Sequence, residues 1–163
     1  MYPISISTLA TDLIIVCKRK KIKIATAESC TGGLVAGSLT EITGSSAVFE
    51  RGFNTYSNES KCELLGVSPD DIMAFGAVSK QVAGQMAVGA LNNAPVQLTA
   101  AVTGIAGPEG GTPEKPVGTV HIASACKGKS ILNKEFLFTG DRQKVRLDAV
   151  RTALGMMMRQ VVD

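Results

Sequence analysis

The sequence predicts an α/β protein, built as a three-layer α/β/α sandwich around a mixed β-sheet. Helical and strand patterns alternate up to residue 104, which is typical of parallel strands joined by helices. Two strand patterns then follow each other directly, at 117–125 and 130–138, around the turn Lys127-Gly128-Lys129. This second observation predicts an antiparallel hairpin, and therefore a sheet of mixed direction.

The elements of the first half are expected from periodicity and from residues that start or stop helices. Ser7 or Thr8 can cap a first helix with an apolar stripe from Leu9 to Cys17. The β-branched run 22–27 predicts the first strand. Gly44 ends a helical pattern that begins at Leu34. The next elements are expected as a strand over 47–56, a short helix over 59–65 that stops at Gly66, and a short helix opened by Pro69.

Periodicity and capping residues also predict the elements of the second half. Ser79 is expected to start a helix that runs to about Asn92, and a buried strand spans 96–104. Asp141 is expected to cap the last helix. The stretch from Gly104 to Pro116 has no periodicity and is rich in glycine and proline. A loop of this length in a compact domain is usually functional or disordered.

Composition favours one globular domain over residues 1–163. Apolar residues make up 45% of the chain and charged residues 19%, a balance that suits a packed core. The net charge of +3 and the absence of Trp argue against a surface that stacks nucleic-acid bases. Four isolated cysteines and one histidine predict no zinc site. No apolar run is long enough to span a membrane, so we expect a protein of the reducing cytoplasm.

The stretch AESCTGG at 27–33 is the most informative part of the chain. It joins a strand to a helix through a tight turn with two adjacent candidate nucleophiles, Ser29 and Cys30. Gly32 and Gly33 allow a ligand close to the backbone, and the free N–H groups of the next helix are expected to face that ligand. Thr31 completes the candidate binding turn.

Each nucleophile has an alternative interpretation. A serine in a turn is often only a helix cap. Cys30 is a rival because a helix N-terminus lowers the pKa of a thiol. A Ser-His-Asp triad would depend on His121, the single histidine, which falls in a predicted strand.

A second cluster lies in YSNESK at 56–61. Lys61 is a candidate general base if burial lowers its pKa, and Tyr56 is a candidate relay for the proton. The alternative is a solvated surface lysine. Neither the Ser-x-x-Lys nor the Tyr-x-x-x-Lys spacing is present.

Two further segments are candidate ligand contacts. Thr103, Gly104 and Gly107 follow a buried strand, and ligands of open α/β sheets bind at the carboxyl ends of strands. Arg142 lies at the start of the last helix, where its positive charge opposes the helix dipole. An anionic ligand, or pairing with Asp141 or Asp148, would offset this unfavourable position.

Taken together, five motifs resemble the CinA C-terminal domain family. They are AESCTGG at 27–33, TYSNESK at 55–61, GAVS at 76–79, TGIAGPEGGTPEKPVGTV at 103–120 and GDRQKVR at 140–146. The match spans nearly the whole chain in the same order. The resemblance implies a nicotinamide-nucleotide amidohydrolase of pyridine-nucleotide salvage, in its standalone form, and a homo-oligomer, expected to be a dimer.

The resemblance also implies a mechanism without metal or cofactor. It implies that Ser29 attacks the carboxamide of nicotinamide mononucleotide and that Tyr56 and Lys61 assist it, giving nicotinic acid mononucleotide and ammonia. The N–H groups of Cys30, Thr31 and Gly32 are the expected oxyanion donors, and Arg142 is the expected phosphate ligand. Two alternatives remain open: a non-catalytic nucleotide-binding module, and an interaction domain in competence or DNA repair that does not bind nucleic acid directly.

Overall fold

The computed structural model of the protein describes residues 2–162. The elements in chain order are α1 (Ile4–Lys20), β1 (Ile24–Glu28), α2 (Leu34–Thr40), the 3₁₀ turn η1 (Ser45–Ala47), β2 (Phe49–Asn54), α3 (Asn58–Leu65), α4 (Pro69–Phe75), α5 (Lys80–Asn92), β3 (Leu98–Gly104), β4 (Thr119–Cys126), β5 (Leu132–Leu137) and α6 (Arg142–Val162).

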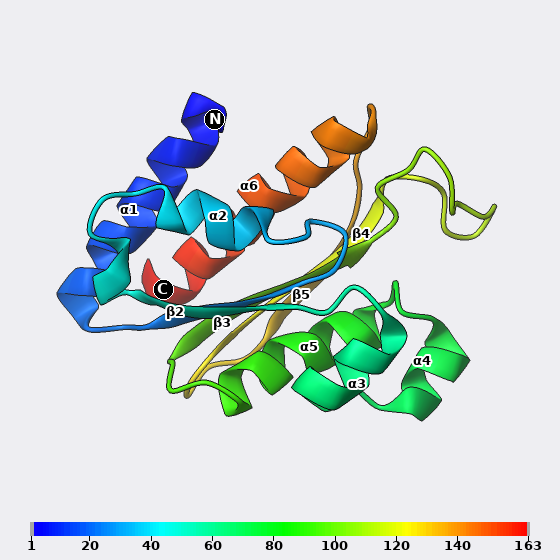
Figure 1. Ribbon diagram of the computed structural model, residues 1–163, viewed down its shortest axis with the longest axis horizontal. Coiled ribbons are helices and arrows are strands. Elements are labelled where there is room, and N and C mark those ends of the chain that lie inside the picture. The colour runs from blue at the N-terminus through cyan, green and yellow to red at the C-terminus, as the bar shows by residue number, and fades with distance from the viewer. Residues whose placement is uncertain (1, 163) are drawn as a thin grey trace.

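The strands form one mixed sheet in the order β2-β1-β3-β4-β5. Strand β1 runs parallel to both of its neighbours, β2 and β3, whereas β4 is antiparallel to β3 and to β5. Helices α1, α2 and α6 cover one face of the sheet, and α3, α4 and α5 lie on the other (Figure 1). The predicted three-layer α/β/α sandwich with a mixed sheet is therefore confirmed.

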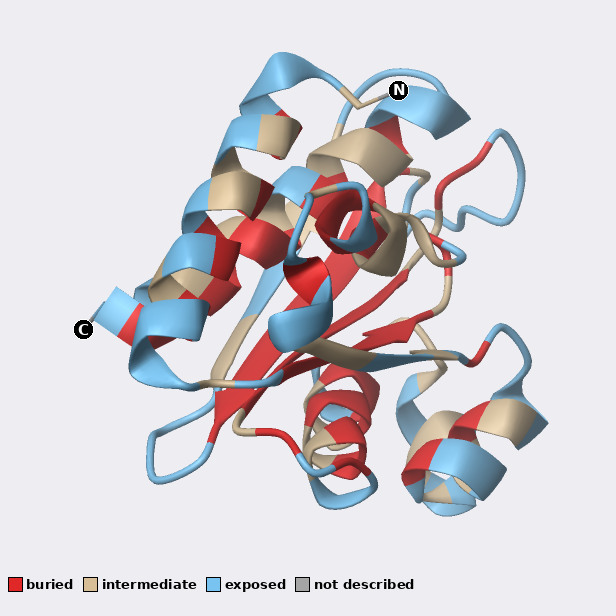
Figure 2. Cartoon of the chain, turned by 60° about the vertical axis from the view of Figure 1, so that its left-hand side comes forward, coloured by how far each residue is buried: buried red, intermediate tan, exposed pale blue. Residues whose placement is uncertain are grey.

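The core lies on both faces of the three central strands, which Figure 2 shows as a buried layer between helices. Alternate residues of a strand point to opposite faces. The face towards α1 and α6 carries large side chains such as Ile24, Leu98 and Ile122, whereas the face towards α5 carries alanines such as Ala101 and Ala123. The small side chains let α5 pack close to the sheet. Among residues 2–162, no helix has the length and apolar composition that crossing a bilayer requires.

Most predicted elements are confirmed to within a few residues, including the hairpin of β4 and β5. The predicted caps are also present: Ser79 Oγ accepts from the Val82 amide, and Asp141 Oδ1 accepts from the Lys144 amide at 2.8 Å. The expectation that Ser7 or Thr8 caps the first helix is wrong. Helix α1 begins at Ile4, because its buried face starts one turn earlier, at Ile6.

The topology brings three chain segments to one edge of the sheet. Because β1, β2 and β3 are parallel, their carboxyl ends lie side by side. The segments that leave these ends are 29–33, 55–57 and 105–118. Three of the four sequence regions that were singled out as candidate sites therefore meet at this edge, where ligands of open α/β sheets bind.

Helix α5 touches the end of α3 at a position that has no room for a side chain. A Cβ built on Gly89 would lie 2.0 Å from the backbone oxygen of Leu65, the last residue of α3. Gly155 in α6 is the opposite case, because a Cβ there meets no atom within 4 Å. The two glycines form a matched pair for testing the packing of the α3–α5 layer.

We expect Gly89→Ala to lower the free energy of unfolding by about 3 kcal/mol, since a backbone oxygen cannot move aside cheaply. Gly155→Ala is expected to raise it by about 1 kcal/mol through helix propensity. Urea unfolding of both variants beside the parent protein measures the difference. Equal stabilities of the two variants would contradict the close contact of α3 and α5.

Candidate active site

Ser29 stands on a turn whose backbone is tightly specified. Its N–H donates to Val102 O at 3.0 Å, which extends the pairing of β1 with β3 by one residue. The turn is closed by the Gly32 N–H, which donates to Ser29 O at 3.0 Å. Gly32 and Gly33 have φ values of +56° and +95°, a region that residues with a Cβ rarely adopt. The two glycines are therefore required to reverse the chain into α2.

Lys61 reaches Ser29 from α3. Its Nζ lies 3.1 Å from Ser29 Oγ and donates to the carbonyl oxygens of Thr55 at 2.7 Å and Tyr56 at 3.3 Å. The side chain is buried, with 1% of its surface exposed. The interpretation of Lys61 as a solvated surface lysine is wrong. This contact places a candidate base within hydrogen-bond distance of a candidate nucleophile.

The surroundings of Lys61 lower the pKa of its amine. Burial lowers its pKa from the ordinary value of 10.5, an effect that the neighbouring thiols of Cys30 and Cys62 partly oppose. Within residues 2–162 no carboxylate forms an ion pair with it. Burying a cation without a counter-charge costs free energy. The Lys61 amine therefore loses its proton at a lower pH than a solvated lysine does.

Tyr56 contributes to the site in two ways. Its carbonyl oxygen accepts from Lys61 Nζ, whereas its ring is 67% exposed and its Oη lies 3.4 Å from Arg142 Nη2. The direct contact between Lys61 and Ser29 makes a proton relay through this hydroxyl unnecessary. Tyr56 thus borders the opening of the site.

A cavity of about 270 Å³ opens above Ser29. Besides Ser29 and Tyr56 it is lined by Cys30, Gly104, Ile105, Ala106, Gly107, Glu109, Gly110 and Arg142. Four of the expected binding residues are in this lining. Ile105, Ala106, Glu109 and Gly110 were not singled out from the sequence, although the irregular composition of the loop that carries them marked the region.

The other expected binding residues lie beside the cavity. Thr31 is fully buried, and Thr103 Oγ1 donates to Ala77 O at 2.9 Å. The Gly33 N–H donates to Glu28 Oε2 at 3.0 Å. Like Gly32, these residues shape the backbone around the cavity and do not line it.

Glu28 changes the expected role of the helix N-terminus. Its carboxyl group is buried and accepts the N–H groups of Gly33, Val35 and Ala36 at 2.8–3.0 Å. The expectation that these N–H groups face a ligand is therefore wrong. Earlier in the turn, the structure describes no oxygen that accepts the N–H of Cys30 or Thr31.

Cys30 is not activated. Burial raises the pKa of its thiol to about 11, and the charge of Glu28 adds to this effect. The nearby guanidinium groups of Arg146 and Arg142 oppose the rise without cancelling it. The expectation of a lowered pKa for this thiol is wrong, because burial outweighs the backbone N–H and the two guanidinium groups that act in the lowering direction. Near neutral pH the thiol is protonated, which leaves Ser29 as the better candidate nucleophile.

Two arginines of α6 point at the site and bind backbone oxygens. Arg142 Nη1 donates to Gly107 O at 2.8 Å. Arg146 donates through Nε to Cys30 O and through Nη2 to Thr31 O, both at 3.0 Å. Asp148 instead pairs with Lys144 and Arg151, so the expected pairing of Arg142 with this carboxylate is not observed.

His121 takes no part in the Ser29 cluster. It lies on β4, paired in register with Thr103, and β3 separates it from β1. Its Nε2 is 3.2 Å from Glu135 Oε2. Neighbouring strands are about 4.8 Å apart, so two strand spacings put His121 roughly 10 Å from Ser29. The Ser-His-Asp arrangement is therefore absent.

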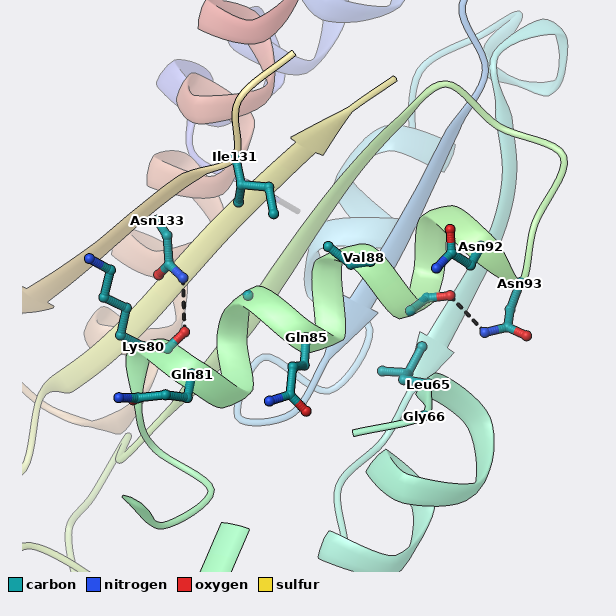
Figure 3. A pocket seen from close by; sticks show the side chains of 12 residues that line it. Leu65, Gly66, Lys80, Gln81, Gln85, Val88, Asn92, Asn93, Ile131 and Asn133 are labelled. Carbon is teal, nitrogen blue, oxygen red and sulfur yellow. Dashed lines mark hydrogen bonds between the residues drawn. The ribbon is translucent and has the colours of Figure 1, made fainter. Parts of the chain in front are cut away.

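A larger hollow of about 800 Å³ lies along the outer face of α5 (Figure 3). Its lining is mostly amide and apolar, with Gln81, Gln85 and Asn92 beside Val88 and Ile131. Lys80 is its one titratable residue. It offers no nucleophile with a base, so the chemistry points to the smaller cavity. Within residues 2–162, no group of three or more His, Cys, Asp and Glu side chains is placed to hold a metal ion.

The chain is similar to several known proteins. The model of the CinA C-terminal domain matches residues 6–161. The nicotinamide-nucleotide amidohydrolase PncC of Enterobacter agglomerans is 47% identical over 154 residues, which is 94% of each chain. The crystal structure of the competence/damage inducible protein CihA from Agrobacterium tumefaciens superposes with a TM-score of 0.96 at 48% identity, covering 98% of this chain and 97% of that one.

Longer relatives also match. One from Caldicellulosiruptor saccharolyticus, whose name refers to competence damage, is 43% identical over the whole of this chain. The chain spans only 39% of that relative's length. The family match over nearly all residues, together with close relatives of equal length, shows that the chain belongs to the CinA C-terminal domain family.

Proposed function

We propose that this protein hydrolyses the carboxamide of nicotinamide mononucleotide to nicotinic acid mononucleotide and ammonia, with Ser29 as nucleophile. The observation that carries the proposal is the 3.1 Å contact between the buried amine of Lys61 and Ser29 Oγ, since Ser29 lines the cavity. The name of the PncC relative supports the choice of substrate. We propose further that residues 1–163 act as one domain.

The first half of the reaction forms an acyl-enzyme. Neutral Lys61 takes the proton of Ser29 Oγ, and the oxygen bonds to the carboxamide carbon. The tetrahedral intermediate carries a negative oxygen. Lys61 then returns the proton to the amide nitrogen, the C–N bond breaks, and ammonia leaves.

The second half releases the acid. Lys61 takes a proton from water, the hydroxide oxygen bonds to the acyl carbon, and the bond to Ser29 Oγ breaks. The proton then returns from Lys61 to Ser29 Oγ. One buried amine thus serves as base and acid in both halves, which requires a pKa well below that of a solvated lysine.

The negative oxygen of the tetrahedral intermediate needs N–H donors that form no other backbone hydrogen bond. The N–H groups of Cys30 and Thr31 meet this condition, whereas the Gly32 N–H donates to Ser29 O. Cys30 and Thr31 are therefore the proposed oxyanion donors. Loss of one such donor typically costs about 3–4 kcal/mol of transition-state stabilisation.

Arg142 is the proposed ligand of the 5′-phosphate. It is the one basic residue in the cavity lining and is held by Gly107 O. Two of its nitrogen atoms already have partners, yet a guanidinium has five N–H donors, so donors remain for phosphate oxygens. Glu109 is the acidic residue of the same lining.

We also propose a cytoplasmic protein that acts as a homodimer. All four cysteines are free thiols, and three of them are buried. Unpaired cysteines are typical of reducing compartments. The dimer rests on the family resemblance and is tested by sedimentation of the purified chain.

Ammonia release from nicotinamide mononucleotide tests the proposed function. The assay is run in EDTA, with free nicotinamide and the intact dinucleotide as comparison substrates. Release from the mononucleotide alone supports both the substrate and a mechanism without metal. Binding in a thermal-shift assay without ammonia release would instead indicate a nucleotide-binding module.

We expect Ser29→Ala to abolish ammonia release and Cys30→Ala to keep much of it, because the Cys30 thiol is protonated at neutral pH. Steady-state rates of both variants measure this. An inactive Cys30→Ala variant beside an active Ser29→Ala variant would assign the nucleophile to the thiol.

We expect Lys61→Met to lower kcat by at least about 100-fold with little change in KM, because a base acts in the transition state. In the parent protein the rate rises with pH as Lys61 loses its proton, with a midpoint below 10.5. A pH series of kcat measures both effects. Lys127→Met, in an exposed turn, is the control, and a parent-like kcat in Lys61→Met would remove Lys61 from the mechanism.

We expect Arg142→Ala to raise KM for the mononucleotide about tenfold or more, the size of a charged hydrogen bond of roughly 1.5–3 kcal/mol. Slow turnover of the dephosphorylated riboside is expected to change little. Comparison of KM for the two substrates measures the effect. An equal rise in KM for both substrates would mean that Arg142 does not bind the phosphate and acts only through its bond to Gly107 O.

A further inference from the structure

The turn that carries Ser29 is held at two places by ionisable side chains that do not line the cavity. Glu28 accepts N–H groups on the α2 side, and Arg146 donates to the carbonyl oxygens of Cys30 and Thr31 on the α6 side. Neither side chain touches Ser29 Oγ or Lys61 in the described hydrogen bonds. Their effect on the reaction therefore passes through the backbone.

Arg146 acts on a peptide group that contains a candidate oxyanion donor. The carbonyl of Cys30 and the N–H of Thr31 belong to one planar trans peptide, so they point in opposite directions. The bond from Arg146 Nε to Cys30 O, at 3.0 Å, therefore sets the direction of the Thr31 N–H. It also polarises the peptide, because the donor is charged. The second bond, from Nη2 to Thr31 O, limits rotation of the next peptide.

Glu28 holds the other end of the same turn. Both of its carboxyl oxygens are used: Oε2 accepts two N–H groups, those of Gly33 and Val35, and Oε1 accepts that of Ala36. With 1% of its surface exposed, the group has little access to competing water. The bonds tie the start of α2 to the last residue of β1, directly before Ser29. The N–H groups of Cys30 and Thr31 take no part in these bonds.

We propose that Glu28 and Arg146 are positioning residues: they fix the backbone of this turn and, through it, the positions of Ser29 Oγ and the Thr31 N–H. The proposal rests on the proposed function, since it assigns these residues to the acylation of Ser29. A misplacement of about 1 Å can lower a rate by about 100-fold, so loss of either support is expected to reduce kcat.

The first experiment measures kcat and KM for Arg146→Ala and Arg146→Lys, with Arg151→Ala as the matched control on the exposed side of α6. We expect kcat of Arg146→Ala to fall between about 10- and 100-fold with KM within about twofold. Millimolar guanidinium is expected to restore part of the rate. The pH midpoint stays unchanged, because Lys61 is not touched. A loss confined to KM, or a lower melting temperature with parent-like kcat, would overturn the role of Arg146.

The second experiment reports on Ser29 without the nucleotide. Phenylmethylsulfonyl fluoride sulfonylates an activated serine: the Oγ–S bond forms, fluoride leaves, and Lys61 takes the proton. The rate is followed by mass spectrometry of the intact chain, and Ser29→Ala marks the background. We expect Arg146→Ala and Glu28→Gln, which places an NH₂ against a backbone N–H, to be labelled at least about tenfold more slowly.

The outcomes separate this inference from the proposed substrate. Labelling of the parent protein without ammonia release would reject the substrate and still allow the comparison of variants. Parent-like labelling of folded Arg146→Ala and Glu28→Gln would overturn the positioning role and leave the substrate standing. A parent protein whose Ser29 is not labelled and that releases no ammonia would overturn both.

Discussion

Burial of the Lys61 amine among carbonyl oxygens is the interaction on which the arrangement of the site depends. The amine takes its partners from the segment after β2 and from Ser29 after β1, so it joins two strand ends that are distant in sequence. Burial lowers the pKa of this amine, and no carboxylate in the described part of the chain pairs with it. The burial that fixes the amine between two strand ends therefore also lets it lose its proton at lower pH than a solvated lysine.

Two side chains of opposite charge, Glu28 and Arg146, bind the backbone of the turn that carries Ser29. The carboxyl group of Glu28 accepts amides at the start of α2, and Arg146 donates to two carbonyl oxygens earlier in the turn. The two opposite charges shift the pKa of the Cys30 thiol in opposite directions, and burial keeps this thiol protonated near neutral pH. Cys30 lines the cavity, and the N–H groups of Cys30 and Thr31 are the donors proposed for the anion that forms during the reaction. Such preorganised donors stabilise a transition state more than a substrate.

Much of the fold could be predicted because most elements carry a clear periodicity and some helices carry a recognisable cap, as Ser79 and Asp141 show. The pairing of Ser29 with Lys61 could be suggested only by resemblance, since the polar sequence around Lys61 reads as a surface helix. The role of Glu28 was missed, because a glutamate at the end of a strand gives no sign of which amides it will accept. Arg142 and Arg146 share one helix face, and only the packing of α6 decides which oxygen each one reaches.

The glycine contact between α5 and α3 has a consequence beyond stability. Leu65 ends α3, the helix that carries Lys61. Gly89 lets the backbone of α5 lie directly against the backbone of Leu65. Helix α3 can therefore lie closer to its neighbour in the same layer than a side chain at position 89 would allow. Because α3 also carries Lys61, a residue without a side chain on another helix contributes to the placement of the candidate base.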